Sequence, residues 1–216
     1  MNARTEVLTR IRQAIGESRD LPVARQYRRA GDHPPGAPDL VELFADRVRD
    51  YRAEVVGCDD NDAAIAAAIS GVLAARHVSR LVVPPGVPEA WLPVGQRVVD
   101  GDPPLTHQQL DQAAGVLTGS TVAMAETGTI VLDGSALCGR RAMTLVPDLH
   151  LVVVRGDDIV ESVPEGLARL DPRRPLTFIS GPSATSDIEL ERVEGVHGPR
   201  QLVAIVASPH AAYLPS

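Results

Sequence analysis

The chain of 216 residues contains no lysine, so arginine accounts for all 21 of its basic side chains. Without lysine the protein cannot form a Schiff base with a substrate or with pyridoxal phosphate. It also lacks the lysine of a G-x-x-x-x-G-K-[ST] phosphate loop and that of a protein kinase. An acidic ligand would therefore have to be held by arginine forks, backbone amides and hydroxyl groups.

Cysteine and paired histidines are scarce as well. Cys58 and Cys138 are far apart and form no C-x-x-C motif, so the chain lacks the cysteine pattern of an iron–sulfur cluster or a four-cysteine zinc site. The six histidines include no H-x-x-x-H or H-x-H pair, and no G-x-G-x-x-G fingerprint follows a predicted strand. We therefore expect no metal and no cofactor in this chain.

Long apolar runs are absent too. The most apolar stretch, 63–75, has thirteen residues, whereas a membrane span needs about 20. Arg4, Arg10 and Arg12 interrupt the apolar residues near the N-terminus, which argues against a signal peptide. We therefore expect a soluble, cytoplasmic protein.

Net charge is unevenly distributed along the chain. The whole chain carries −7, whereas residues 1–30 carry +4 because seven arginines stand against three acids, which leaves −11 for the rest. This balance argues against a nucleic-acid binder, which needs a basic surface. Residues 1–38 are predicted to form a first helix that ends at Gly16 and an arginine- and proline-rich arm. The arm either has its own partner or is a solvated surface segment.

Residues 39–216 are predicted to form a single α/β domain. Asp39 is expected to cap an amphipathic helix, after which short apolar strands alternate with helical patterns as in a parallel sheet. The expected elements are strands at 54–56, 80–83 and 97–99, a helix at 61–76 and a helix capped by Thr106. This alternation favours a three-layer α/β/α fold with a mixed, mainly parallel sheet.

The middle and the end of the domain add further expected elements. Four apolar segments are joined so tightly that we expect them to pair antiparallel: 122–125, 129–132, 142–146 and 149–154. After them we expect a helical pattern up to Leu170, a strand at 176–180, a helix at 187–194 and a last strand at 201–206. No internal repeat is visible.

The first candidate site is the segment 125–129, where Glu126 and Thr127 precede Gly128 at the end of a predicted strand. Ligands of α/β sheets bind at such strand ends. Glu126 is a candidate general base, nucleophile or acceptor for a substrate hydroxyl, with Thr127 and the Gly128 amide as donors to an anion. The alternative is a hairpin turn that carries an exposed glutamate.

The second candidate site is the segment 180–189, where a strand leads through a Gly-Pro turn into a predicted helix. Ser183 and the helix N-terminus would suit a phosphate or a small carboxylate. The alternative is helix capping, because Ser186 and Glu189 form a capping box and two acids already complement the helix dipole. Asp187 is also a candidate for orienting an arginine or a ligand hydroxyl.

The third candidate site precedes the last strand and contains His197 and Arg200. His197 is a candidate general acid or base near neutral pH, or a residue that takes hydrogen from an α-hydroxy acid. The alternative is a histidine that locks its loop through hydrogen bonds to backbone carbonyls. Arg200 can bind a carboxylate through its fork. Arg140 and Arg141 are secondary candidates for an acidic ligand, and the alternative for them is a solvated pair at the start of a strand.

These three sites contain three motifs: Glu126-Thr127-Gly128-Thr129, Gly181-Pro182-Ser183-x-x-x-Asp187-Ile188-Glu189 and Val196-His197-Gly198-Pro199-Arg200. In this order they closely resemble the lactate utilization protein C family, whose shared domain is called the LUD domain, over about residues 40–207. One departure is Ala184, where we expect many relatives to carry arginine. If that arginine holds an anionic ligand in the relatives, Arg200 and Arg140 are the candidates to replace it here.

The resemblance implies a core like that of the sugar-phosphate isomerase and coenzyme A transferase superfamily. It also implies an accessory subunit that helps iron–sulfur partner proteins to oxidise L-lactate to pyruvate and carries no cluster itself. The alternatives are a stand-alone acyl or coenzyme A transferase or hydrolase in which Glu126 attacks a thioester, and a small-acid or nucleotide sensor. The candidate catalytic residues are Glu126 and His197, and the candidate substrate-binding residues are Thr127, Gly128, Arg140, Arg141, Ser183, Asp187 and Arg200.

Overall fold

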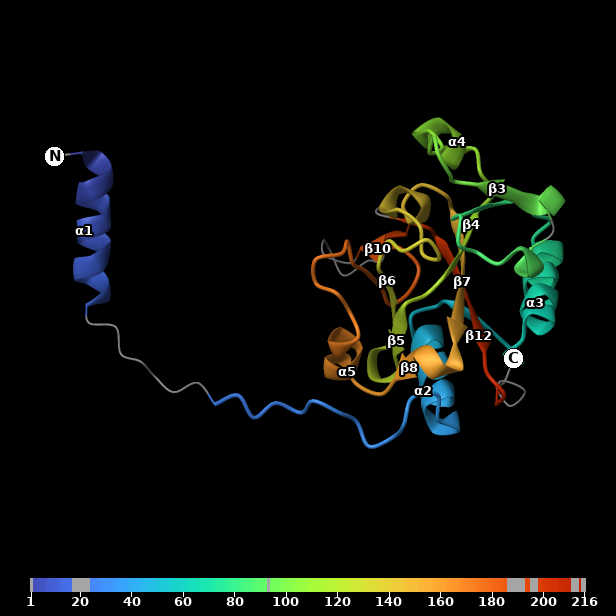
Figure 1. Cartoon of the computed structure of the whole chain (residues 1–216), viewed down its shortest axis with the longest axis horizontal. Coiled ribbons are helices and arrows are strands. Elements are labelled where there is room, and N and C mark those ends of the chain that lie inside the picture. The colour runs from blue at the N-terminus through green and yellow to red at the C-terminus, as the bar shows by residue number, and fades with distance from the viewer. Residues whose placement is uncertain are drawn as a thin grey trace.

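The computed structural model describes residues 2–16, 24–92, 94–185, 193–194, 198–210 and 214. Its first element, α1 (Ala3–Ile15), lies apart from the body of the molecule (Figure 1). The Asn2 side chain caps its start, and Gly16 ends it with a φ of 67°, which favours glycine. None of its residues is buried. The first helix expected from the sequence is thus confirmed.

The body is built on a six-stranded sheet in which all neighbouring strands are parallel. Its strands, in spatial order, are β1 (Glu54–Cys58), β12 (Gln201–Ala207), β7 (Leu149–Arg155), β4 (Val116–Gly119), β2 (Leu81–Val83) and β3 (Arg97–Val99). The central strands are continuous apolar runs because layers cover both of their faces. A mainly parallel α/β sheet, as expected from the sequence, is confirmed.

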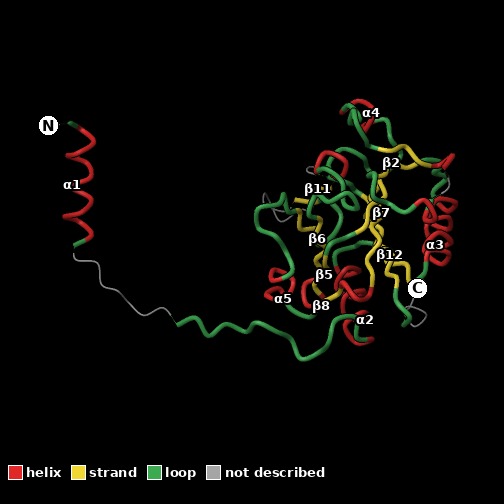
Figure 2. Tube along the Cα trace, in the orientation of Figure 1, coloured by secondary structure: helices red, strands yellow, loops and turns green. Residues whose placement is uncertain are grey.

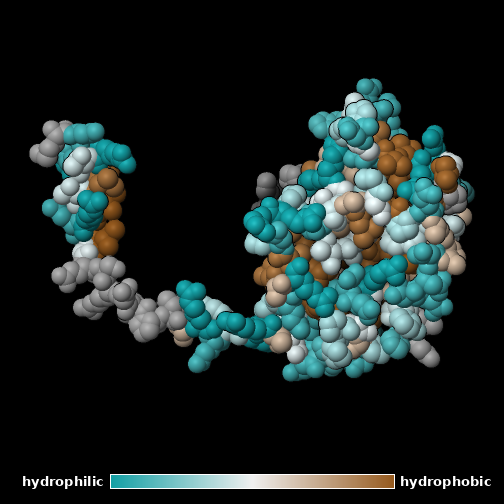
Figure 3. Space-filling model, viewed as in Figure 1, coloured by the Kyte–Doolittle hydropathy of each residue, from teal (hydrophilic) through white to brown (hydrophobic). Residues whose placement is uncertain are grey.

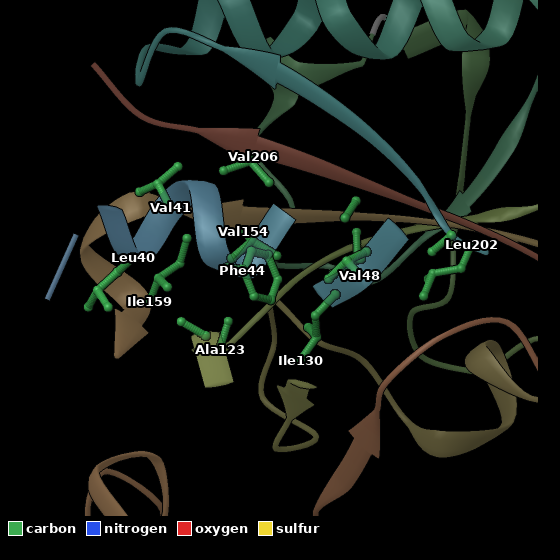
Figure 4. Close-up of a cluster of buried hydrophobic side chains, with 14 of the residues drawn as sticks. Leu40, Val41, Phe44, Val48, Ala123, Ile130, Val154, Ile159, Leu202 and Val206 are labelled. Atoms are coloured by element: carbon green, nitrogen blue, oxygen red, sulfur yellow. The ribbon is translucent and has the colours of Figure 1, made fainter. Parts of the chain in front are cut away.

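A helix and a second sheet together cover one face. The helix α2 (Pro38–Asp50) buries Phe44 against Val154 and Val206 (Figure 4). Ala123 and Ile130 of the second sheet join the same cluster. The strands of that sheet, in spatial order, are β8 (Ile159–Val160), β5 (Val122–Met124), β6 (Thr129–Leu132) and β9 (Thr177–Ile179). Its outer face carries α5 (Val163–Ala168).

The opposite face of the six-stranded sheet is covered by α3 (Asp62–Ala75), which lies across β7 from the second sheet (Figure 2). Ile65 and Ile69 pack with Leu117 and Leu151 there. The Trp91 ring, from η1 (Glu89–Trp91), completes this cluster. The shorter elements are η2 (Val94–Gln96), α4 (His107–Asp111), η5 (Gly156–Asp158), β10 (Ala184–Thr185) and β11 (Val193–Glu194).

Three local predictions are wrong. Residues 142–146 contain no strand, because η4 (Arg141–Thr144) turns there through local bonds such as Met143 N to Arg140 O. The strand at 149–154 does not pair antiparallel, since β7 lies parallel to β4 and β12. Asp39 is not the cap of α2, because Ala37 holds that position and Asp39 lies in the first turn.

Two further differences concern the chain after residue 157. The helix expected up to Leu170 is the short α5, which begins only after η5 and β8. The helix expected at 187–194 is wrong at its end, because Val193 and Glu194 form β11 and pair antiparallel with β10; residues 187–192 lie outside the described residues. In the described part of the chain, no helix is long and apolar enough to cross a membrane.

Candidate functional site

Glu126 lies in η3 (Ala125–Thr127), the turn that joins β5 to β6 in an antiparallel hairpin. Gly128 ends this turn in the left-handed region, with a φ of 59°. A Cβ atom on Gly128 would lie 2.8 Å from the carbonyl carbon of Arg47 in α2, and its amide donates to the Ala125 carbonyl. The hairpin-turn alternative therefore describes this backbone, and Gly128 is required for packing against α2.

The carboxylate of Glu126 is paired with the N-terminal arm. Arg28 Nη1 donates to Glu126 Oε1 at 2.6 Å, and Nη2 donates to Glu161 Oε1 at 2.7 Å. The Glu126 side chain is still 36% exposed, whereas that of Glu161 is only 11% exposed. Sequence reasoning gave neither Arg28 nor Glu161 a role in a site. The feature of the sequence that could have indicated Arg28 and Glu161 is the opposite net charge of the N-terminal arm and of the rest of the chain.

A chain of hydroxyl groups connects the first motif to the second. Thr127 Oγ1 lies 2.8 Å from Thr129 Oγ1, which lies 2.9 Å from Ser180 Oγ. The Ser183 amide donates to the Pro199 carbonyl at 2.8 Å, which joins the second motif to the third. The described parts of the three motifs therefore lie side by side, because β6 pairs with β9 and brings the two loops together. Asp187 and His197 lie outside the described residues.

Two of the three arginines expected at the site already bind carboxylates. Arg140 donates to both oxygens of Asp100, at 2.7 and 3.0 Å, and to the Leu105 carbonyl. Arg200 Nε donates to Asp148 Oδ1 at 2.5 Å. Each carboxylate raises the pKa of the arginine that it binds. In the described structure the cation at Glu126 is Arg28, and neither Arg140 nor Arg200 contacts that carboxylate.

Arg141 differs from these two, because no carboxylate among the described residues lies within ion-pair distance of it. Its Nη1 donates to Thr144 Oγ1 at 3.3 Å, and partial burial lowers the pKa of its guanidinium. A Cβ atom on Gly198 would lie 3.6 Å from the Thr144 carbonyl oxygen and 3.5 Å from Ser183 Cβ. Thr144, the hydrogen-bond partner of Arg141, therefore lies beside the second and third motifs.

A buried histidine that sequence reasoning did not single out lies behind Arg141. His150 of β7 is 1% exposed and shares a 2.8 Å hydrogen bond with Thr118 Oγ1 of β4. Burial, with a smaller contribution from the charge of Arg141, lowers its pKa to about 3. Its ring is therefore neutral at physiological pH and links two central strands of the sheet.

The described residues include no group of three or more His, Cys, Asp or Glu side chains that could hold a metal ion. Cys58 and Cys138 are both free thiols. Burial, together with nearby acidic charge, raises the pKa of Cys58 to about 11, so its thiolate is scarce at neutral pH. An absence of cofactors in the whole chain stays a prediction.

Comparison with known proteins places this geometry in a family. The family model of the LUD domain matches residues 96–207. Lactate utilization protein C of Deinococcus radiodurans is 46% identical over 215 residues, which cover 94% of this chain and 95% of the relative. The chain belongs to the lactate utilization protein C family of LUD-domain proteins. The three motifs lie within the matched LUD region, whereas Arg28 and α2 precede it.

Other similar proteins support this assignment over part of the chain. Lactate utilization protein C of Bacillus subtilis is 32% identical over 47% of this chain and 45% of the relative. The crystal structure of a DUF162 family protein from Deinococcus radiodurans, at 41% identity, has a TM-score of 0.66 and covers 78% of this chain and 96% of that chain. The mixed α/β fold of this LUD-domain protein is thus shown by a related crystal structure.

Proposed function

We propose that this chain is the cluster-free subunit of a cytoplasmic system that oxidises L-lactate to pyruvate together with iron–sulfur partner proteins. The observation that carries the proposal is its 46% identity, over nearly the full length of both chains, to a lactate utilization protein C. Oxidation of lactate to pyruvate releases two electrons and two protons. In this proposal the electrons pass to the clusters of the partners, and this chain assists substrate binding or assembly.

The placement of the described motifs supports a role in binding a small 2-hydroxy acid. In this proposal the Arg141 guanidinium binds the carboxylate. Thr127, Thr129 and Ser180 carry hydroxyl groups that lie within hydrogen-bond distance of one another. In this proposal Asp187 and His197, with Glu126, are the candidates for handling the substrate hydroxyl.

Gene deletion tests the proposed system. Cells without this chain should fail to grow on L-lactate yet grow normally on pyruvate, and the wild-type gene should restore growth. Copurification of the tagged chain with iron–sulfur proteins, detected by their visible absorbance and iron content, would identify the partners. Normal growth on L-lactate, with a normal rate of lactate oxidation in extracts of the deletion strain, would exclude the proposal.

A pair of arginine variants tests substrate binding separately. In the assembled system, R141Q should raise the KM for L-lactate about tenfold, because a charged hydrogen bond to the carboxylate is lost. R200Q is the matched control, since Arg200 is exposed and already binds Asp148; its KM should match that of the wild type. Equal KM values for all three proteins would remove Arg141 from the substrate site.

A further inference from the structure

Residues 28–37 of the arm, here called the strap, lie against the body near η3 and α5 (Figure 1). Its C-terminal end is held by backbone packing, because the Gly36 amide donates to the Ile159 carbonyl at 3.0 Å. Gly36 has a φ of 73°, and a Cβ atom there would lie 3.2 Å from the carbonyl carbon of Gly156. The strap therefore follows a defined path over η5 and β8.

Glu161 receives most of the polar contacts of the strap. Its Oε2 accepts hydrogen bonds from the Asp32 amide at 2.7 Å, the His33 amide at 2.9 Å and His33 Nδ1 at 2.9 Å. Its Oε1 accepts from Arg28. The hydrogen bonds from the His33 ring, the His33 amide and the Asp32 amide, that of the ring first, lower the pKa of Glu161 to about 2. The contact with Glu161 raises the pKa of His33. Glu161 is therefore an ionised anchor at physiological pH.

The fit between strap and anchor depends on one glycine. A Cβ atom on Gly31 would lie 2.4 Å from Glu161 Oε2 and 2.5 Å from Glu161 Cβ, which is closer than real Cβ atoms approach. The Gly31 backbone also hydrogen-bonds the Glu165 carboxylate of α5. Only a glycine at position 31 therefore allows the strap backbone to lie this close to Glu161 and Glu165.

Arg28 joins the anchor to the candidate site. Its guanidinium lies between the carboxylates of Glu126 and Glu161, one nitrogen on each, as suits a planar fork. Its side chain is 52% exposed, and ion pairs at such exposure contribute little to stability. The guanidinium can therefore leave the two carboxylates without unfolding of the body.

We propose that Glu126 and Glu161 form a guanidinium-binding site for an arginine-bearing extended peptide, which the chain's own strap fills through Arg28. The strap and any other ligand of the Glu126 carboxylate are then mutually exclusive. Competition with lactate at Glu126 rests on the proposed function, whereas the guanidinium site rests only on the contacts of Arg28, Gly31 and His33 with the body.

Carboxyl labelling of the full-length chain tests the occupied site. Carbodiimide with glycine ethyl ester modifies accessible carboxylates, and mass spectrometry reports Glu126 and Glu161 separately. Glu126 in R28A should react about fivefold faster than in the wild type, as expected for loss of an exposed ion pair. R29A is the matched control, because Arg29 has no carboxylate within ion-pair distance in the described chain. Equal Glu126 labelling in wild type and R28A would overturn the proposal.

A competing peptide tests the class of ligand. The six-residue peptide Arg-Arg-Ala-Gly-Asp-His, which has the sequence of residues 28–33, should increase hydrogen exchange at the strap amides of the intact chain. A peptide with glutamine in place of both arginines should not. E161Q should increase the same exchange without any peptide, while circular dichroism reports an unchanged body. Unchanged exchange with the arginine peptide at millimolar concentration, or in E161Q, would contradict the proposed site.

Kinetics in the assembled lactate system separate the two proposals. If lactate uses Glu126, R28A should lower the KM for lactate, because the competing guanidinium is gone. If Glu126 labelling rises in R28A while the KM is unchanged, the guanidinium site stands and the role of Glu126 in lactate binding is excluded. If labelling does not rise, the guanidinium site is excluded whatever the KM.

Discussion

At Gly128 the absence of a Cβ atom lets the β5–β6 hairpin lie directly on α2. We expect G128A to lower the free energy of unfolding by roughly 2–4 kcal/mol, because it adds left-handed strain to a steric overlap with Arg47. G71A is the control: a Cβ there meets nothing within 4 Å in α3, so it should stabilise by roughly 0.5–1 kcal/mol. Urea denaturation measures both, and a G128A protein as stable as the wild type would contradict the packing argument.

Arg140 and Arg200 look equivalent in the sequence but should differ in their effect on stability. R140M leaves Asp100, whose side chain is 3% exposed, without its bidentate partner. It should therefore lower the free energy of unfolding by roughly 1.5–3 kcal/mol. R200M removes an exposed ion pair and should change stability by less than about 0.5 kcal/mol. Thermal and urea unfolding would test this, and equal losses for the two variants would contradict it.

Sequence reasoning could name the three arginines of interest but could not rank them. The ranking depends on Asp100 and Asp148, which lie 40 and 52 positions away from their arginines. Arg28 was not recognised for the same reason, since its partner Glu126 is 98 positions away. Residue type predicts what a side chain can bind, whereas only the fold decides which partner reaches it first.

At the scale of elements, the apolar runs predicted most strands and the antiparallel pairing of 122–125 with 129–132, but not the parallel partners of the strand at 149–154. The runs at 54–56, 129–132 and 201–206 are strands, because their β-branched and apolar residues suit a covered sheet. The run at 142–146 is equally apolar but forms η4, since a short buried run does not distinguish a strand from a helical turn. The parallel partners of β7 come from distant crossovers that no local pattern encodes.

The two N-terminal helices should respond differently to substitution. Phe44 of α2 is fully buried, so F44A should lower the free energy of unfolding by roughly 3–5 kcal/mol. One side of the exposed helix α1 is apolar (Figure 3). Ile11 of α1 is 46% exposed, so I11D should change the free energy of unfolding of the body by less than about 0.5 kcal/mol. A large loss in I11D, measured by urea unfolding followed at Trp91, would show that α1 packs on the body in solution.

At the scale of the whole molecule, we expect the buried His150 to make the free energy of unfolding decrease as the pH falls. Its pKa is about 3 in the folded chain and about 6.5 when unfolded, so the unfolded chain takes up a proton first as the pH falls. Stability should decrease by roughly 1.5 kcal/mol between pH 6.5 and pH 5 from this residue alone. The double variant T118V/H150L, which removes both polar partners, should show a flatter profile in urea titrations. An unchanged pH profile would contradict this assignment.

The order of strands has a consequence for how the chain is made. β1 pairs only with β12 in the six-stranded sheet, with Glu54 opposite Val203. Until β12 has left the ribosome, β1 and β7 both present unpaired edges, which favour association with other chains. Messages truncated before Gln201 should therefore yield aggregates rather than a partly active protein, because β1 then lacks the strand with which it pairs.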